Sequence, residues 1–510
     1  MPTPTVRRLL LVATAVFVLV ALGCAEEDDP VVFTHGVASG DARPNSAILW
    51  TRIDREATLT VEVATDDAFG DVLLEQEVAA SADRDFTAKI EVTGLEPGTG
   101  YYYRFRRDES VSRVGAFRTP PAEGESALVR FVFSGDTDGT VREDGTRAFD
   151  FKVLDAARAE DPDFFLYFGD TIYADSPYGP KAETLAAFRD KYKENRGVLR
   201  LLDILAATSI YTTWDDHEVE NNFAGLTVNP DLFAAGRQAF REYLPIGGDE
   251  TPEVLYRRFR WGSAVELIIL DERSFRDADV EAACTPAGQD TADVLPGLGL
   301  PGVPEAFGSF RAVAGLPPET DLDCIAALTD PSRTMLGEAQ KQFLLQALED
   351  SEATFKFIVN EVPITELAAL PYDRWEGYRA ERDEILRFIA ERQISNVIFL
   401  TTDYHANIIS DVRVDLDSPP VAVEVVTGPI AHTTLATDIV SLVTQFIDVS
   451  PDEALGLFET LLDLVPQVDC VAAGAFSYGL VEVDPVAATA TITLKDEDGR
   501  ELCRTVIEAE

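Results

Sequence analysis

The chain has 510 residues and carries 90 Asp and Glu against 43 Lys and Arg, a formal net charge of -47. This charge excludes nucleic acid as a partner and disfavours anionic lipid surfaces, because both are bound through clustered Lys and Arg. The 46% of hydrophobic residues can build a large core, and the length predicts two or three domains, or one large domain with an accessory module. We attribute most of the acidic charge to solubility, although local carboxylate clusters can also bind metal ions.

The N-terminal segment has the pattern of a bacterial export signal. Arg7 and Arg8 precede an apolar run, residues 9–22, which is shorter than the roughly 20 residues that a membrane-spanning helix needs. Cys24 follows two residues later, and the acidic residues 26–29 come next. This arrangement resembles a lipoprotein signal.

We therefore expect residues 1–23 to be removed as a signal peptide, Cys24 to carry the lipid, and residues 24–30 to form an acidic tether. The protein would be exported and anchored to a bacterial membrane, facing the periplasm or the cell surface. An ordinary signal peptide and an uncleaved anchor are the alternatives, because Ala21 stands where lipoprotein signals usually have Leu.

Residues 31–122 have the pattern of a small all-β module. Strand-like runs are separated by turn residues, which predicts strands at 46–52, 58–64, 86–92 and 101–106. The turn-rich segment 94–100 and the Tyr run after it are similar to a corner of fibronectin-like sandwiches. We expect a fibronectin- or immunoglobulin-like sandwich, followed by a linker at 120–124.

Residues 127–510 have the pattern of a layered α/β domain, in which apolar strands alternate with helices. The expected strands are 129–134, 164–168, 211–214, 265–270, 355–360 and 397–401, and the expected helices are 149–158, 182–206, 337–348 and 378–392. Residues 277–334 are predicted to be a Gly- and Pro-rich insertion, and residues 475–494 a terminal hairpin. Spaced apolar residues in 437–465 predict one or two amphipathic helices packed on the core, with a lid or membrane-facing element as the alternative.

Four cysteines remain after Cys24, an even number that suggests two disulfides in an exported chain. Three pairings are open. We favour Cys284 with Cys324 and Cys470 with Cys503, because each pair lies within one segment of the chain.

Four segments place chemically active side chains after strand-like runs. They contain Asp136 and Asp138; Asp170, Tyr173 and Asp175; Trp214-Asp-Asp-His-Glu-Val-Glu-Asn-Asn222; and Asp403 and His405. In α/β folds such strand ends carry the chemistry, so these groups can form a site for two or three metal ions. Metal ions suit phosphate-ester cleavage, since they neutralise phosphate oxygens and activate water. Mostly oxygen ligands favour Ca²⁺, Mg²⁺, Mn²⁺ or Fe³⁺ over zinc.

From about residue 31 to its end, the sequence resembles the PhoD-type alkaline phosphatases, within the wider calcineurin-like metallophosphoesterase group. Residues 214–222 carry the most distinctive signature, and residues 33–52 are similar to the family's N-terminal module. Other family-like segments are Leu270–Arg273, Gly337–Gln340, Trp375–Tyr378 and Glu381–Arg382. The resemblance implies an α/β (α+β) metallophosphoesterase-like core of two packed β-sheets flanked by helices, preceded by an all-β sandwich.

The resemblance also implies Ca²⁺ and Fe³⁺ as cofactors, with Mn²⁺ and Mg²⁺ as alternatives. Asp170 is expected to bridge metal ions and Tyr173 to bind the ferric ion as a phenolate. The other expected ligands are Asp136, Asp216, Asn221 or its neighbour Asn222, Asp403 and His405.

Three further residues are expected to act on the substrate. His217 would stabilise or protonate the leaving group. Arg273 and Arg374 would contact phosphate, with surface salt bridges as the alternative for each. The other two histidines, His35 and His432, are expected to be structural, although His432 follows Thr427-Gly-Pro and could line the cleft.

Two positions depart from the family pattern. Asp136 stands where the family commonly has a Cys that ligates iron, and Thr402 stands where the last motif usually has Gly. The first change puts the metal identity in question, and the second adds a branched side chain near the metals.

We expect a monomeric, exported, metal-dependent phosphoesterase that cleaves phosphomonoesters or phosphodiesters with metal-activated water. The alternatives are a phospholipase D-like diesterase held near its substrate by the lipid anchor, and a non-catalytic Ca²⁺-binding surface lipoprotein. The metal-ligand segments argue for an enzyme, and the departures at Asp136 and Thr402 keep the last alternative open.

Overall fold

The computed structural model describes residues 30–510 except 249–250, 252, 281–325, 367–372, 438–439, 442–449, 452, 454 and 457–466. The predicted signal peptide, Cys24, residues 24–29 of the tether and the predicted Cys284–Cys324 disulfide lie outside the described residues. Most of the predicted insertion and most of the predicted helical segment 437–465 lie outside them as well. Within the described part, no helix is both long and apolar enough to cross a membrane.

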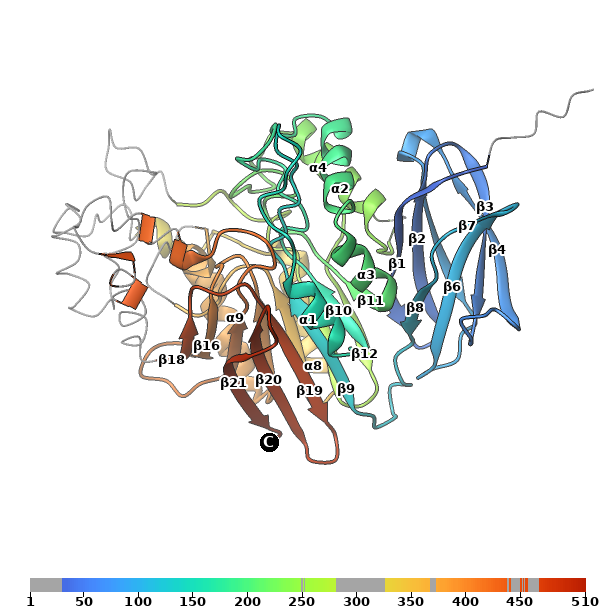
Figure 1. Cartoon of the computed structure of the whole chain (residues 1–510). Helices are drawn as coiled ribbons and strands as arrows, with labels where there is room; N and C mark the ends of the chain where they lie inside the picture. The colour runs from blue at the N-terminus through green and yellow to red at the C-terminus, as the bar shows by residue number, and fades with distance from the viewer. Residues whose placement is uncertain are drawn as a thin grey trace, which may run out of the picture.

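Three β-sheets organise the described part of the chain (Figure 1). The first has nine strands in the order β21 (Glu501–Glu508), β20 (Thr489–Asp496), β19 (Ser477–Asp484), β9 (Val129–Ser134), β10 (Phe164–Tyr167), β11 (Ser209–Tyr211), β1 (Phe33–Arg43), β2 (Ser46–Ile53) and β5 (Thr87–Thr93). The second has the order β12 (Arg257–Trp261), β13 (Val265–Ile269), β14 (Phe355–Asn360), β15 (Val397–Thr401), β17 (Ala422–Val426), β16 (Asn407–Val412) and β18 (Val468–Ala472). The third has β4 (Val72–Ala80), β3 (Ala57–Ala64), β6 (Gly100–Arg107) and β7 (Ser110–Val111), with β8 (Gly115–Arg118) also paired to β6.

The two larger sheets pack face to face, and their central strands are apolar on both faces. In β9, Phe131 and Phe133 enter the core between the sheets, where the ring of Phe131 meets that of Phe357 at 5.3 Å. Val132 between them belongs to a separate core under the helices. A strand covered on both sides buries every side chain, which explains why it appears in the sequence as an unbroken apolar run.

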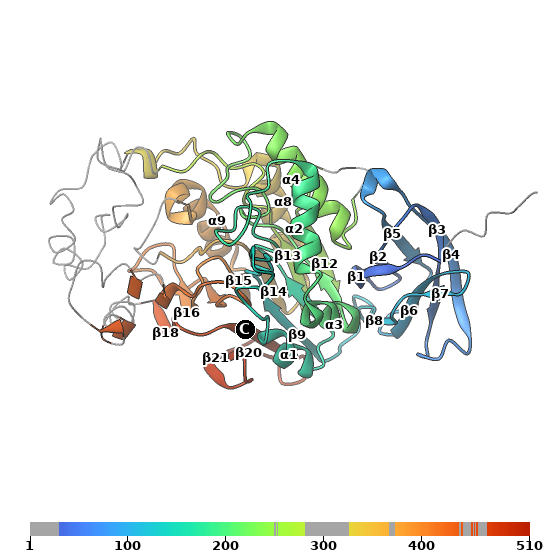
Figure 2. The same cartoon turned by 45° about the horizontal axis from the view of Figure 1, so that its top comes forward.

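Helices cover the outer faces of both large sheets. The helices α1 (Val153–Ala159), α2 (Leu185–Asn195), α3 (Leu199–Ala207) and α4 (Pro230–Tyr243) pack on the nine-stranded sheet. On the seven-stranded sheet lie α8 (Gly337–Asp350), the 3₁₀ turn η3 (Trp375–Tyr378) and α9 (Arg379–Arg392). Figure 2 shows the helices on either side of the strands. The predicted architecture of two packed sheets flanked by helices is confirmed.

The single helix predicted for 182–206 is wrong, because the chain breaks it into α2 and α3 at Arg196–Val198. Asn195, the last residue of α2, is buried and uses its side chain to fasten neighbouring loops. Its amide oxygen accepts from the Gly139 N–H at 2.7 Å, and its amide nitrogen donates to the Thr171 carbonyl oxygen at 2.7 Å. The last residue of α2 therefore connects the helix to the loops after β9 and β10.

The N-terminal strands form the predicted sandwich, and one of its sheets is continuous with the core. Strand β1 pairs in parallel with β11, so β1, β2 and β5 extend the nine-stranded sheet, and the third sheet packs against them. Trp50 of β2 donates its indole N–H to the Glu242 carbonyl oxygen at 2.7 Å, and the guanidinium of Arg196 lies 3.8 Å from its ring. These buried contacts join the sandwich to the helical layer.

A disulfide between Cys470 and Cys503 joins β18, at the end of the seven-stranded sheet, to β21, at the end of the nine-stranded sheet. The Cα atoms of the two residues lie 6.0 Å apart, and the pairing is the one favoured from the sequence.

Candidate metal centre

The site lies where parallel strands of both large sheets end. Strands β9, β10 and β11 are parallel neighbours in one sheet, and β13, β14 and β15 are parallel neighbours in the other. The loops after these strands carry Asp136, Asp170, residues 215–217, Arg273 and residues 403–405. Because the carboxyl ends of parallel strands share one edge, residues far apart in the sequence meet there.

The backbone of these loops is held in an uncommon conformation. Asp136, Asp170, Asp403 and His405 have positive φ angles of 56°, 49°, 61° and 53°. Non-glycine residues pay a cost for this conformation and keep it only where neighbours enforce it, which is common at functional sites. Here the Asp136 N–H donates to the Gly169 carbonyl oxygen at 3.1 Å and thereby ties the first loop to the second.

The loops of the site approach one another so closely that a side chain is excluded at two glycines. A β-carbon on Gly135 would lie 2.1 Å from the Phe168 carbonyl oxygen. A β-carbon on Gly169, where φ is +71°, would lie 2.5 Å from Thr402 Oγ1. The side chain of Thr402 therefore packs against the backbone of the Asp170 loop.

Acidic and imidazole side chains form three overlapping groups in which the candidate ligand atoms lie within 4.8 Å of one another. The groups are Asp136, Asp170 and His405; Asp170, Asp216 and His217; and Asp215, Asp216 and Asp403. Asp170 belongs to the first two groups, which is the arrangement expected of a carboxylate that bridges two ions. The structure thus brings together six of the residues predicted from the sequence.

The buried carboxylates fit metal ions. Asp136 is fully buried, and neither of its carboxylate oxygens has a hydrogen-bond partner; Asp216 Oδ1 also lacks one. Burial, together with the negative charges of Asp216 and Asp215, raises the pKa of the Asp170 carboxyl well above its usual value. Unpaired buried carboxylates are costly, and cations remove this cost. A donor set of many oxygens and few imidazoles suits hard cations.

Tyr173 completes the first group. Its hydroxyl lies 3.1 Å from His405 Nε2, and that nitrogen lies 3.4 Å from Asp136 Oδ1. Burial and the charges of Asp170 and Asp136 raise the pKa of the Tyr173 phenol well above its usual value. A cation among these groups would reverse the electrostatic part of that shift and favour the phenolate.

His217 is held by a carboxylate that the sequence analysis did not assign to the site. Its Nδ1 lies 2.5 Å from Asp175 Oδ1, and the other oxygen of Asp175 accepts from the Asn221 N–H at 2.8 Å. This bond leaves Nε2 directed toward Asp216, whose Oδ1 lies 3.9 Å away. Burial opposes protonation of His217, but Asp216 and Asp175 outweigh it and raise its pKa to about 9.

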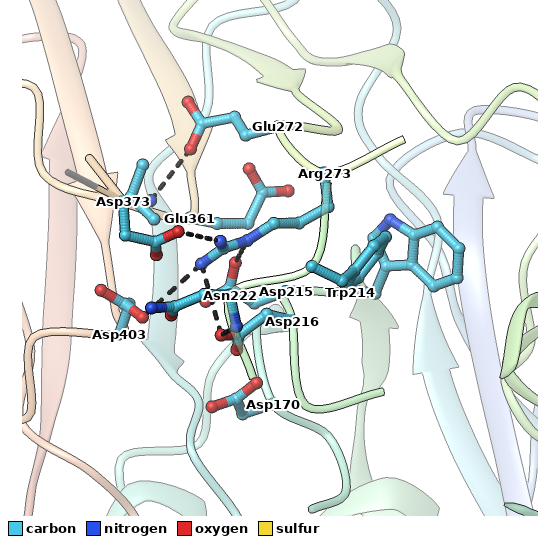
Figure 3. A network of polar contacts seen from close by, with 12 residues as sticks. Asp170, Trp214, Asp215, Asp216, Asn222, Glu272, Arg273, Glu361, Asp373 and Asp403 are labelled. Atoms are coloured by element: carbon cyan, nitrogen blue, oxygen red, sulfur yellow. Dashed lines mark hydrogen bonds and ion pairs between the residues drawn. The ribbon is translucent and has the colours of Figure 1, made fainter. Parts of the chain in front are cut away.

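Arg273 occupies the third group as a buried cation (Figure 3). Its Nε donates to Asp215, its Nη1 donates to Asp373 at 2.8 Å, and its Nη2 lies 3.8 Å from Asp216 and 3.7 Å from Asp403. The side chain has no exposed surface. Arg273 therefore neutralises and orders the carboxylates at the centre in this structure.

Several of the segments that resemble the family bind Asp271 and Glu272, the two residues that precede Arg273. Gln340 holds both the N–H and the carbonyl of Asp271 at 2.8 Å. Trp375 donates its indole N–H to Glu272 at 2.8 Å, and Trp214 donates its own to Asp271 at 2.9 Å. The segments around these residues thus fix the loop that carries Arg273.

Two other predicted residues lie beside the three groups. The Arg374 side chain is buried, pairs with Glu376 at 3.0 Å and lies 4.9 Å from the Tyr404 ring, so it is not a surface residue. Asn221 is exposed. The next residue, Asn222, donates its N–H to Asp216 at 2.5 Å and appears in the network of Figure 3.

Sequence reasoning did not assign Asp175, Asp215 or Asp373 to the site, where the structure places them. His432, expected to be structural with a place in the cleft as the alternative, lies beside Tyr173. For Asp175 and Asp215 a signal existed, since each lies in a segment that the motif analysis had singled out. Asp373 had no local signal, because its role depends on contacts with Arg273 and Arg276.

The fold and the site define a class: α/β proteins with two stacked sheets that can bind metal ions through carboxylates and imidazoles at the strand ends. The chain matches the PhoD-like phosphatase family over residues 144–490 and the N-terminal domain of PhoD-like phosphatases over residues 20–121. The protein belongs to the PhoD-like phosphatase family.

Known proteins are similar to this chain in sequence or in fold. Alkaline phosphatase D of Bacillus subtilis (strain 168) is 29% identical over 432 residues, which are 76% of this chain and 66% of that protein. The solved structure of PhoD superposes with a TM-score of 0.71 at 23% identity and covers 93% of each chain. A purple acid phosphatase from yellow lupin (Lupinus luteus) seeds gives 0.58 at 11% identity, over 94% of this chain and 74% of that one. The two structures share the fold with this protein.

Proposed function

We propose that this protein is a metal-dependent hydrolase of phosphoric esters. The observation that carries the proposal is the buried carboxylate of Asp170, which two groups of candidate ligands share at the ends of parallel strands. The oxygens of Asp136 and Asp216 that accept no hydrogen bond lie beside it and support a site built for cations. Family membership and the likeness to a curated alkaline phosphatase support the ester class.

The residues present could hold a hard trivalent ion and Ca²⁺. Asp136, Tyr173 and His405, with the shared Asp170, would hold the trivalent ion, for which Fe³⁺ is our expectation. Asp216 and Asp170, which share a ligand group, would hold Ca²⁺ together with Asn221 or Asn222, as expected from the sequence. When bound, such ions supply Lewis acidity that neutralises phosphate oxygens and lowers the pKa of water.

The side chains of the protein supply the proton and the alignment. His217 would give a proton from Nε2 to the leaving oxygen, while Asp175 holds Nδ1 and thereby the orientation of the ring. Arg273 would keep the carboxylates of Asp216 and Asp403 in place. Of the two arginines expected to contact phosphate, Arg374, buried beside Tyr404, is the one that we propose for this role.

We further propose that the protein acts as an exported lipoprotein anchored through Cys24 and that it functions as a monomer. The Cys470–Cys503 disulfide supports export, because disulfides persist in oxidising compartments. The substrate would be a phosphomonoester or a phosphodiester outside the cytoplasm.

The test is release of phosphate or alcohol from a panel that contains a phosphomonoester, a phosphodiester and a phospholipid, with Asp170→Asn as the inactive variant. Glu62→Gln is a matched control, because Glu62 is a buried carboxylate that pairs with Arg104 and Arg106 in the sandwich, away from the centre. Hydrolysis by the wild type and the control but not by Asp170→Asn supports the proposal. Turnover of phospholipid alone indicates the phospholipase D-like alternative, and no turnover with added metals leaves a binding protein.

A further inference from the structure

Tyr173 is surrounded by imidazoles. The chain has four histidines, and three of them contact this phenol: His217 at 4.3 Å and His432 at 4.1 Å between ring centroids, and His405 through the hydroxyl. The neighbours of Tyr173 in the chain, Ile172 and Ala174, pack into the apolar core under the helices. The phenol is therefore positioned mainly by other rings of the site.

His432 stacks flat on Tyr173, with 6° between the ring planes, whereas His217 is inclined by 31°. Two imidazoles at these distances cannot occupy the same face of one phenol without overlapping, so they flank it on opposite faces. The clamp leaves the hydroxyl as the free end of the ring, and this end meets His405 at 3.1 Å.

The backbone around His432 is fixed to the loop that carries Asp136. The Ala431 N–H donates to the Asp136 carbonyl oxygen at 2.9 Å, and the Asp138 N–H donates to the Ala431 carbonyl oxygen at 2.8 Å. The Ile430 N–H donates to the Gly135 carbonyl oxygen at 3.0 Å. The His432 ring, which follows this segment, therefore has a defined position relative to Asp136. It can hold Tyr173 in place beside Asp136, Asp170 and His405.

His432 does not sit as a ligand itself. The three ligand groups found among the described residues do not include it. Its Nδ1 lies 3.2 Å from Thr433 Oγ1, and the centroid of the Phe149 ring lies 5.8 Å from that of its own ring. It contacts the centre through ring-to-ring packing with Tyr173 and His405.

We propose that His432 is a positioning residue of the metal centre: its ring clamps the Tyr173 phenol against His217 and thereby holds the phenol oxygen beside Asp136 and His405. The inference rests on the proposed function in that it takes the centre to bind metal. Residues that orient metal ligands contribute about 10- to 100-fold to metal affinity or activity when removed, which sets the size of the effect.

The test uses two variants and a control. His432→Ala removes the ring, and His432→Phe keeps a flat ring without nitrogens. His35→Ala is the control, because His35 lies in the sandwich beside Arg52. Metal-free protein is titrated with Tb³⁺, a hard cation whose emission is excited through a nearby phenol, and Tyr173→Phe defines the part of the emission that depends on Tyr173. Hydrolysis of a phosphomonoester is measured on the same preparations, reloaded with metal.

We expect His432→Ala to raise the Kd for Tb³⁺ about tenfold and to lose most of the Tyr173-dependent emission. His432→Phe should stay within about threefold of the wild type, since stacking does not need the nitrogens. An unchanged His432→Ala, or a His432→Phe as defective as His432→Ala, would overturn the inference. Tb³⁺ results as expected, with no hydrolysis by the wild type, would instead refute only the proposed function.

Discussion

The pair of Asp175 and His217 gives the sharpest prediction about catalysis. In Asp175→Asn the amide can still meet His217 Nδ1, which lies 2.5 Å from the native carboxylate, but the negative charge is gone. That charge is one of the causes, after Asp216, that raise the pKa of His217 to about 9 against the opposing effect of burial. An adjacent opposite charge shifts a pKa by about 1 to 3 units, so we expect a fall of about 1 unit or more.

The sign of the pH effect follows from the proton that His217 donates. The proton is present below the pKa and lost above it, so kcat/KM should fall on the alkaline side in the wild type. In Asp175→Asn this fall should begin about 1 pH unit lower, and kcat/KM should drop by about tenfold to a hundredfold, within the range of general acid catalysis. The assay is phosphomonoester hydrolysis from pH 6 to 10, and Asp163→Asn, a carboxylate at the opposite end of β10, is the control.

An additional measurement separates proton donation from folding. A substrate with a very acidic leaving group needs little protonation, so Asp175→Asn should hydrolyse it almost as fast as the wild type does. Equal losses for good and poor leaving groups, or an unmoved alkaline limb, would refute the assignment of His217 as the acid and of Asp175 as the residue that orients it.

Two further predictions concern the loops and the buried acids. Gly169→Ala should destabilise the protein by about 1–3 kcal/mol and reduce activity, because φ is +71° and the new β-carbon would lie 2.5 Å from Thr402 Oγ1; adding Thr402→Gly should restore part of the loss, and chemical unfolding that shows no loss in the single variant would contradict this. Burial and the charge of Glu272 raise the pKa of Glu361, so its proton is kept in the folded state and released in the unfolded state above about pH 4.5; wild-type stability therefore falls as pH rises through that window. Glu361→Gln should gain stability relative to the wild type as pH rises above about 4.5, and a stability difference that does not change with pH in urea unfolding would argue against it.

The parts of the fold that the sequence predicted are those in which local pattern and burial agree. Strands β9 and β14 lie within core clusters on both faces, and their apolar runs matched the predicted 129–134 and 355–360. Strand β1 was missed, because Gly36, Gly40 and Asp41 interrupt its apolar pattern, and its place depends on pairing with β11. Local patterns carry no information about such long-range pairing.

The candidate site divides in the same way. Asp136, Asp170 and Asp403 could be predicted because each lies in the loop just after a strand, where α/β folds gather reactive groups. The burial of Arg273 could not be predicted, since it depends on four acidic residues from three loops. The role of His432 could not be predicted either, because it depends on stacking with Tyr173, which lies 259 positions earlier in the chain (432 minus 173).

The most direct test of the central claim is the metal content of the purified chain from residue 31 onward, measured by elemental analysis beside Asp170→Asn and the control Glu62→Gln. The account predicts at least two ions per chain in the wild type and the control, Fe and Ca by our expectation. It predicts the loss of at least one ion in Asp170→Asn, because Asp170 belongs to two ligand groups. A wild type that holds no metal after growth and dialysis with these cations, or an Asp170→Asn variant that holds as much as the wild type, would contradict the account.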